Sequence, residues 1–216
     1  MGKRATALVA PAPKAVMAPP VRCVRFLTWW EKEVLRQVES LGGFYNSHAH
    51  LDRANTLEPD FLERYGITPL AASSYPLAVK QNLVGELHKD KGYTEENLRD
   101  RMSLELDRQL ALGVTRIDSN IDATPDLPEG GLLAIRVALE LSKEYEKRGL
   151  LLRIAPTPIF GFKPDPNHKR TRWEVFEEAA KLCHYLSLLP EKDDFPSGSD
   201  PDGKIGFERH VRRGIE

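Results

Sequence analysis

The most informative segment of this 216-residue chain reads Phe44-Tyr45-Asn46-Ser47-His48-Ala49-His50-Leu51-Asp52. It begins with residues of high β propensity and becomes polar toward its end, which predicts a short strand that leads into a loop. Residues i and i+2 of a strand project from the same face, so His48 and His50 are expected to point the same way. Two imidazoles at that spacing can bind one metal ion. His48 and His50 are therefore the predicted metal ligands.

A regular alternation of helix and strand patterns follows residue 93. Further strands are predicted at 114–121, 150–155 and 185–189. Helices are predicted between them, with another from Phe207 onward, and strands separated by helices of this length are typical of βαβ units with a parallel sheet. The predicted fold class is α/β, with parallel (βα) units of a TIM-type barrel. About four of eight units are counted, and a complete barrel usually takes about 250 residues.

The segments before this alternation differ in character. Residues 1–27 are rich in Ala and Pro and are predicted to be a flexible tail, while 28–216 is predicted to be the barrel-like domain. A helix is expected to begin at the capping box Thr28-x-x-Glu31. Residues 53–93 contain several prolines and glycines and are predicted to form a long irregular excursion with one helical turn. Long loops in compact domains are usually functional.

Composition and motifs exclude several classes. The chain has 31 basic and 32 acidic residues and a net charge of −1, so no broad basic face for nucleic acid is expected. No apolar run approaches the roughly 18 residues that a membrane span needs. Two cysteines without C-x-x-C spacing predict a cytoplasmic protein without a disulfide framework. Motifs of serine hydrolases, P-loop NTPases and dinucleotide enzymes are absent from the sequence. The expected partner is a small-molecule substrate.

Two histidines do not complete a metal site, because catalytic zinc usually has about three protein ligands and a water. Asp122 follows the second predicted strand on the face where active sites of parallel barrels lie, and we expect it to line or cap the pocket. Asp118 is a further candidate. His184 begins a predicted strand, which is the wrong end. The remaining candidates are expected to be solvated, in loops or on a solvent-facing helix: His88, His168, His210, Glu191, Lys192, Asp193 and Asp194.

Taken in order, these segments resemble the amidohydrolase superfamily, and within it the cytosine deaminase-like branch. The resemblance begins with Ser47-His48-Ala49-His50-Leu51-Asp52. It continues through Leu112-Gly113-Val114-Thr115-Arg116 into Asn120-Ile121-Asp122, then Leu152-Arg153-Ile154-Ala155-Pro156 and Leu188-Leu189-Pro190. It covers about residues 41–216.

The resemblance implies a divalent ion, zinc or iron, that lowers the pKa of a bound water, so that the hydroxide attacks a trigonal carbon bearing nitrogen. His48 and His50 carry over as ligands. The family's other ligands, a His on the fifth strand and an Asp on the eighth, and its proton-shuttling Glu have no counterpart before Glu216. We therefore expect an N-terminal half barrel that is not active alone, needs a C-terminal half or an oligomer, and takes its general acid and base from outside this chain.

The resemblance also implies pocket residues. Cytosine-specific members carry a Gln after the third strand, where this chain has Ile159, which cannot form hydrogen bonds. Asn120 stands where the family has a His on the second strand. The expected pocket residues are thus Asn120, Asp122 and Ile159, and the expected activity is hydrolysis of non-peptide C–N bonds on a substrate other than cytosine.

Two alternatives stay open. TatD-like metal-dependent nucleases and phosphoesterases also begin with a strand that ends in His-x-His-Leu-Asp. A non-catalytic half barrel could instead serve as an interaction module, since its open sheet edges favour association.

Overall fold

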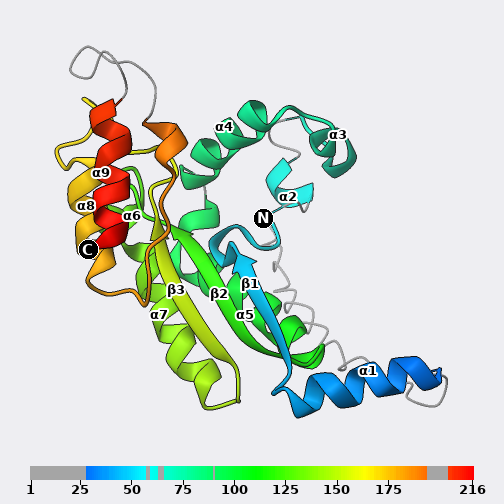
Figure 1. Cartoon of the computed structure of the whole chain (residues 1–216). Helices are drawn as coiled ribbons and strands as arrows, with labels where there is room; N and C mark the ends of the chain where they lie inside the picture. The colour runs from blue at the N-terminus through cyan, green and yellow to red at the C-terminus, as the bar shows by residue number, and fades with distance from the viewer. Residues whose placement is uncertain (1–27, 57–58, 63–65, 90, 194–203) are drawn as a thin grey trace, which may run out of the picture.

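The computed structural model describes residues 28–56, 59–62, 66–89, 91–193 and 204–216. At its centre is a parallel sheet in the order β1-β2-β3 (Figure 1). Its strands are β1 (Phe44–Ala49), β2 (Val114–Asp122) and β3 (Leu151–Thr157). The expectation of a mixed α/β protein with a parallel sheet is confirmed.

Helices flank this sheet, and the first begins at the predicted capping box. In chain order they are α1 (Trp29–Ser40), α2 (Pro59–Leu62), α3 (Pro69–Ser73), α4 (Leu77–His88), α5 (Glu95–Ala111), α6 (Pro128–Gly131), α7 (Leu133–Glu146), α8 (Arg172–Ala180) and α9 (Lys204–Ile215). Short 3-10 turns are η2 (Leu51–Arg53), η4 (Lys91–Tyr93) and η5 (Pro190–Lys192). The capping box of Thr28 and Glu31 opens α1, and that of Thr171 and Glu174 opens α8.

Helices α5 and α7 cover one face of the sheet and form the core with it (Figure 1). Leu98, Met102 and Leu106 of α5 are buried. Ile117 and Ile121 of β2 belong to the same apolar cluster. Because side chains alternate along a strand, Asn120 points to the opposite face from these two isoleucines. The sheet therefore has an apolar face against the helices and a face with polar groups at its carboxyl end.

The fourth predicted strand, 185–189, is not a strand. His184 N–H donates to the Ile154 carbonyl at 2.9 Å, so the segment does meet β3, and Figure 1 shows it running beside that strand. The Ile154 N–H, however, donates to the Nδ1 atom of the His184 ring at 3.1 Å. The ring thus occupies the acceptor position that a strand carbonyl would take, and no ladder forms.

The prediction for residues 53–93 is also wrong, because much of this segment is helical. Pro59 and Pro69 are the first residues of α2 and α3, and Pro76 directly precedes α4. Proline is well tolerated at the start of a helix, where its missing N–H has no intrahelical partner to lose. These prolines mark helix starts, whereas the sequence pattern had favoured interruptions.

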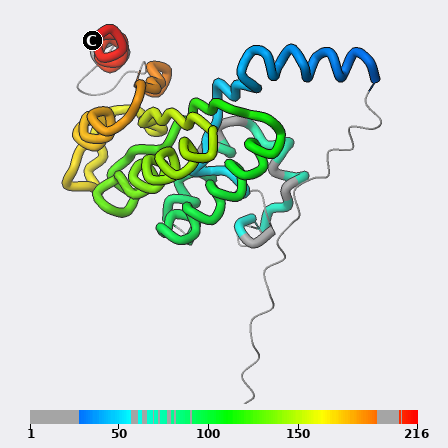
Figure 2. The backbone as a smooth tube through the Cα atoms, turned by 90° about the horizontal axis from the view of Figure 1, so that it is seen from below, coloured from blue at the N-terminus to red at the C-terminus, as the bar shows by residue number. Residues whose placement is uncertain are grey.

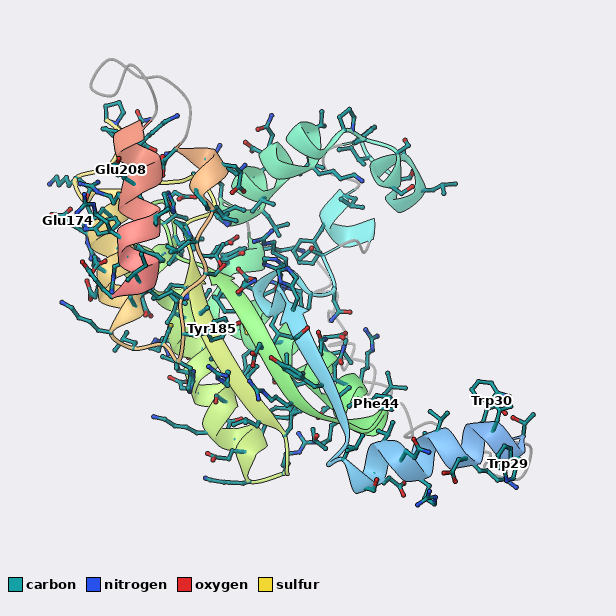
Figure 3. The ribbon with its side chains drawn as sticks, viewed as in Figure 1. Trp29, Trp30, Phe44, Glu174, Tyr185 and Glu208 are labelled. Carbon is teal, nitrogen blue, oxygen red and sulfur yellow. The ribbon has the colours of Figure 1, made fainter. Side chains whose placement is uncertain are left out.

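Helix α1 projects away from the sheet (Figures 1 and 2). None of its side chains is buried, so α1 adds nothing to the core. Trp29 and Trp30 lie at the end far from β1, 80% and 60% exposed (Figure 3). The proposed tail, 1–27, lies outside the described residues. Among the described residues no helix is both long and apolar enough to cross a membrane.

A pair of glycine substitutions tests the end of α7. Gly149 has a φ of 85°, which lets the Leu150 N–H reach the Tyr145 carbonyl at 3.0 Å and ends the helix. Gly149→Ala should lower the free energy of unfolding by about 1–2 kcal/mol, because a Cβ is strained in this region. Gly85→Ala is the control: Gly85 lies inside α4, and among the described residues its added Cβ would meet Phe160 at 3.5 Å, an ordinary van der Waals contact. Urea denaturation should show Gly85→Ala to be neutral or stabilising; equal losses in both variants would contradict this reading.

Candidate active site

A cavity of about 300 Å³ lies at the carboxyl end of the sheet. Each strand contributes to its wall at or just beyond its last residues: β1 through His48 and His50, β2 through Asn120, and β3 through Thr157 and Ile159. The carboxyl ends of parallel strands are where α/β proteins bind ligands. The cavity is therefore the candidate active site.

The two predicted ligands lie side by side in this cavity. The ring centroids of His48 and His50 are 5.0 Å apart, and their planes meet at 79°. A zinc ion about 2.0–2.1 Å from one nitrogen of each ring, at a tetrahedral angle, would hold the centroids about 5 Å apart. The spacing of the pair thus fits a shared metal ion.

Each ring already has a polar neighbour. Asn120 Nδ2 lies 3.3 Å from His48 Nδ1, and Arg53 Nη2 lies 3.0 Å from His50 Nδ1. Burial, assisted by the charge of Arg53, lowers the pKa of His50 to about 4. The ring is therefore neutral at physiological pH, as a metal-binding histidine must be.

Arg53 nevertheless restricts what His50 can bind. A guanidinium only donates hydrogen bonds, so Nδ1 of His50 must accept and its Nε2 carries the proton. A histidine that binds a metal through Nε2 carries its proton on Nδ1, the atom that faces Arg53. In this arrangement His50 can take a cation only after Arg53 leaves Nδ1. Within the described residues, no group of three or more His, Cys, Asp or Glu side chains is placed to hold a metal ion. His48 and His50 would supply two of the roughly four ligands of a zinc ion.

A buried charge network lies beneath the cavity. Asp122 accepts hydrogen bonds from Arg53 at 2.7 Å and from Nε2 of His88 at 3.1 Å. Nδ1 of His88 is 2.7 Å from Asp126. Burial alone would lower the pKa of His88, but the two carboxylates outweigh it and raise the pKa to about 9. His88 is therefore an imidazolium between two aspartates.

The expectation that His88 is solvated is wrong: it is the last residue of α4 and 3% exposed. Asp122, expected to line or cap the pocket, is completely buried below the cavity and reaches it through Arg53. Asn120 and Ile159 do line the cavity.

Asp52, the last residue of the quoted segment, fixes the histidines' strand to its neighbour. Its Oδ2 accepts from the Asp122 N–H at 2.9 Å and from the Tyr93 hydroxyl at 3.0 Å. Arg101 donates to its carbonyl oxygen at 2.9 Å. Burial and the nearby Asp122 carboxylate raise the pKa of Asp52 to about 6. Asp52 thus positions the turn after His50.

The remaining candidates lie in different parts of the fold. Asp118 bonds to Tyr45, and His184 is engaged with β3. His168 lies half-buried in a loop. Glu191 and Lys192, expected in a solvated loop, line the cavity. Asp194 lies outside the described residues.

The prediction that His210 is solvated is wrong, and so is that for Asp193. His210 is 1% exposed, with Nε2 2.6 Å from Asp193, and stacks on Phe162. Burial would raise the pKa of Asp193, but hydrogen bonds from His210 and from the Phe162 and Lys163 amides outweigh it and lower the pKa. This pair joins α9 to the loop after β3.

Sequence reasoning missed Arg53, Lys80 and Thr157 as neighbours of the site, and it wrongly placed His88 in solvent. Only Arg53 carried a signal, since it directly follows the quoted segment. The others come from α4 and from the end of β3, and their spacing in the sequence has no relation to the histidine pair.

Comparison with known proteins gives a fold likeness and a distant relative. No family model matches the chain. An uncharacterized protein of Haemophilus influenzae (strain Rd) is 27% identical over 173 residues, which are 80% of this chain and 55% of that protein. A crystal structure of 5-methylcytosine deaminase from Klebsiella pneumoniae, liganded with phosphonocytosine, matches with a TM-score of 0.59 and 18% identity.

The match with the deaminase covers 81% of this chain and 38% of the deaminase. The chain spans about half the length of the curated relative. At 18% identity the likeness concerns the fold alone.

Proposed function

We propose that this chain supplies part of the active site of a metal-dependent hydrolase that acts on non-peptide C–N bonds. The observation that carries the proposal is the pair of imidazoles, His48 and His50, 5.0 Å apart at the carboxyl end of a parallel sheet. The fold likeness to a deaminase supports the same reaction class. His48 and His50 would hold a zinc or iron ion.

The metal, when bound, lowers the pKa of a water so that hydroxide is present at neutral pH. Asn120 holds the ring of His48 from its Nδ1 side, and Asp52 fixes the turn after His50. Ile159 gives the cavity an apolar wall, and this side chain forms no hydrogen bond with the edge of a substrate ring. The other ligands and the general acid and base are proposed to come from polypeptide beyond the described residues.

Metal titration of the 216-residue chain tests whether His48 and His50 form a half-site, that is, supply only part of the ligands of a metal ion. With two imidazole ligands, cobalt and zinc should bind weakly in isothermal titration, and His48→Asn should abolish that binding. His168→Asn is the matched control, because His168 does not line the cavity. Tight one-to-one binding by this chain alone would show that the half-site idea is wrong.

Activity is tested on the chain together with the rest of its polypeptide. Ammonia release from cyclic amidines and amides should depend on added metal and on His48. Cleavage of single-stranded DNA without ammonia release would favour the nuclease alternative.

A further inference from the structure

One nitrogen atom of Arg53 stands between His50 and Asp122. Nη2 of Arg53 lies 3.0 Å from Nδ1 of His50 and donates to Oδ1 of Asp122 at 2.7 Å. His50 directly follows β1, Arg53 ends the turn η2, and Asp122 is the last residue of β2. The guanidinium thus bridges a candidate metal ligand and a buried carboxylate.

This bridge fixes the ring proton of His50. Because a guanidinium only donates, Nδ1 of His50 accepts and Nε2 carries the proton. A histidine that binds a metal through Nε2 needs the opposite tautomer, in which Nδ1 is protonated and donates to an acceptor. Two donors cannot share one hydrogen bond, and binding through Nδ1 is blocked by Nη2 itself. Arg53 therefore opposes a metal ion at either nitrogen of His50.

The contacts of the Arg53 guanidinium leave part of it unsatisfied. Nη2 makes both of the contacts above, whereas the buried Nε has no hydrogen-bond partner among the described residues. An unpaired buried donor is unfavourable. The side chain is 20% exposed and lines the cavity. Movement of Arg53 into the cavity would hydrate Nε and so offset part of the cost of leaving His50.

Asp122 is placed to take over from Arg53 as the partner of His50. It is completely buried, and its other oxygen, Oδ2, lies 3.1 Å from Nε2 of the imidazolium of His88. His88 therefore keeps a positive charge beside Asp122 when Arg53 leaves. A water molecule in place of Nη2 can accept from a protonated Nδ1 of His50 and donate to Asp122. Metal-bound histidines commonly direct their second N–H to a carboxylate or a water.

We propose that Arg53 controls whether His50 can bind a metal ion. In place, Arg53 keeps the proton on Nε2 and excludes the metal; after it moves into the cavity, Asp122 orients His50 for the metal through Nδ1. The inference rests on the proposed function for the metal, but not for the tautomer of His50. Arg53 and Asp122 are positioning residues, because both act through His50.

The tautomer of His50 tests this role without metal. Long-range proton–nitrogen NMR spectra of the 216-residue chain at neutral pH distinguish a protonated Nε2 from a protonated Nδ1. The proton should be on Nε2 in the unaltered chain and should move to Nδ1 in Arg53→Ala. Arg53→Gln offers an amide oxygen as acceptor and should give the same change, so the test does not depend on Arg53→Ala remaining folded. An unchanged tautomer in the folded variants overturns the inference.

Zinc titration of the same proteins measures the consequence for the metal. Arg53→Ala should bind zinc about tenfold more tightly than the unaltered chain, because no hydrogen bond to a charged group must first be broken. Arg108→Ala is the matched control: Arg108 donates to Asn55, two residues after Arg53, at 2.6 Å. It should leave both the tautomer and the zinc affinity unchanged. Equal zinc affinity in Arg53→Ala and the unaltered chain, or an equal gain in Arg108→Ala, contradicts the inference.

The two measurements separate this inference from the proposed function. If the tautomer changes but none of the proteins binds zinc, the control of His50 by Arg53 stands and the metal-dependent hydrolase proposal fails. If all of them bind zinc alike and the tautomer never changes, the metal site stands and the role of Arg53 fails.

Discussion

Asp122→Ala is expected to lower the free energy of unfolding by about 3–5 kcal/mol. Asp122 has no exposed surface, and it receives Arg53 at 2.7 Å and His88 at 3.1 Å. Its removal leaves a buried cation, His88, and a partly buried one, Arg53, facing an empty position, and breaking a buried ion pair on one side costs this much. For a protein of this size, thermal unfolding should shift downward by about 10 °C.

Two other variants control for the removal of a carboxylate as such. Glu144 pairs with Arg99 on the surface at 2.8 Å, and Glu144→Ala should change stability by less than about 1 kcal/mol. Asp122→Asn keeps the volume and one acceptor oxygen, so its loss of stability should lie between those of Asp122→Ala and Glu144→Ala. If Asp122→Ala unfolded at the same temperature as the unaltered chain, the contacts of Asp122 with Arg53 and His88 would contribute nothing to stability.

Local signals explain which elements could be predicted. Helix α5 has an N-cap at Thr94 and a spine at Leu98, Met102 and Leu106, all within a few residues of one another. The strands β2 and β3 are short, and each follows a glycine, Gly113 or Gly149, that ends the preceding helix. Such signals do not depend on tertiary contacts, so the sequence pattern was sufficient.

The failures come from partners that are distant in the sequence. His88 meets Asp126, 38 residues later, and His210 meets Asp193, 17 residues earlier. When such distant partners are not known, a histidine flanked by charged residues in the sequence is expected to lie in solvent. The segment 185–189 has the composition of a strand. However, the Ile154 N–H, which would donate to a carbonyl of that strand, donates to the ring of His184.

Only the part of the site that depends on local spacing could be predicted. The i, i+2 spacing placed His48 and His50 on one face of β1, and the structure has their rings 5.0 Å apart. The contact of Arg53 with His50 could not be inferred, because it depends on the turn η2 folding back toward Asp122. Whether the pair binds metal stays a prediction.

Alkaline pH should destabilise the protein through His88. The pKa of His88 is about 9 in the folded chain, raised from about 6.5 by Asp122 and Asp126 against the opposing effect of burial. The folded state thus holds this proton more tightly than the unfolded state does. The contribution is fully present below about pH 6.5 and is lost as the pH rises through 9. A difference of about 2.5 pKa units corresponds to roughly 3 kcal/mol.

Urea denaturation at pH 6.5 and at pH 10 measures this loss. The unaltered chain should lose about 3 kcal/mol over that interval, beyond whatever is common to all variants. His88→Gln keeps a donor toward the carboxylates but has no proton to release, so it should be less stable at pH 6.5 and change far less between the two conditions. Parallel losses in the two proteins would assign the alkaline effect to other groups.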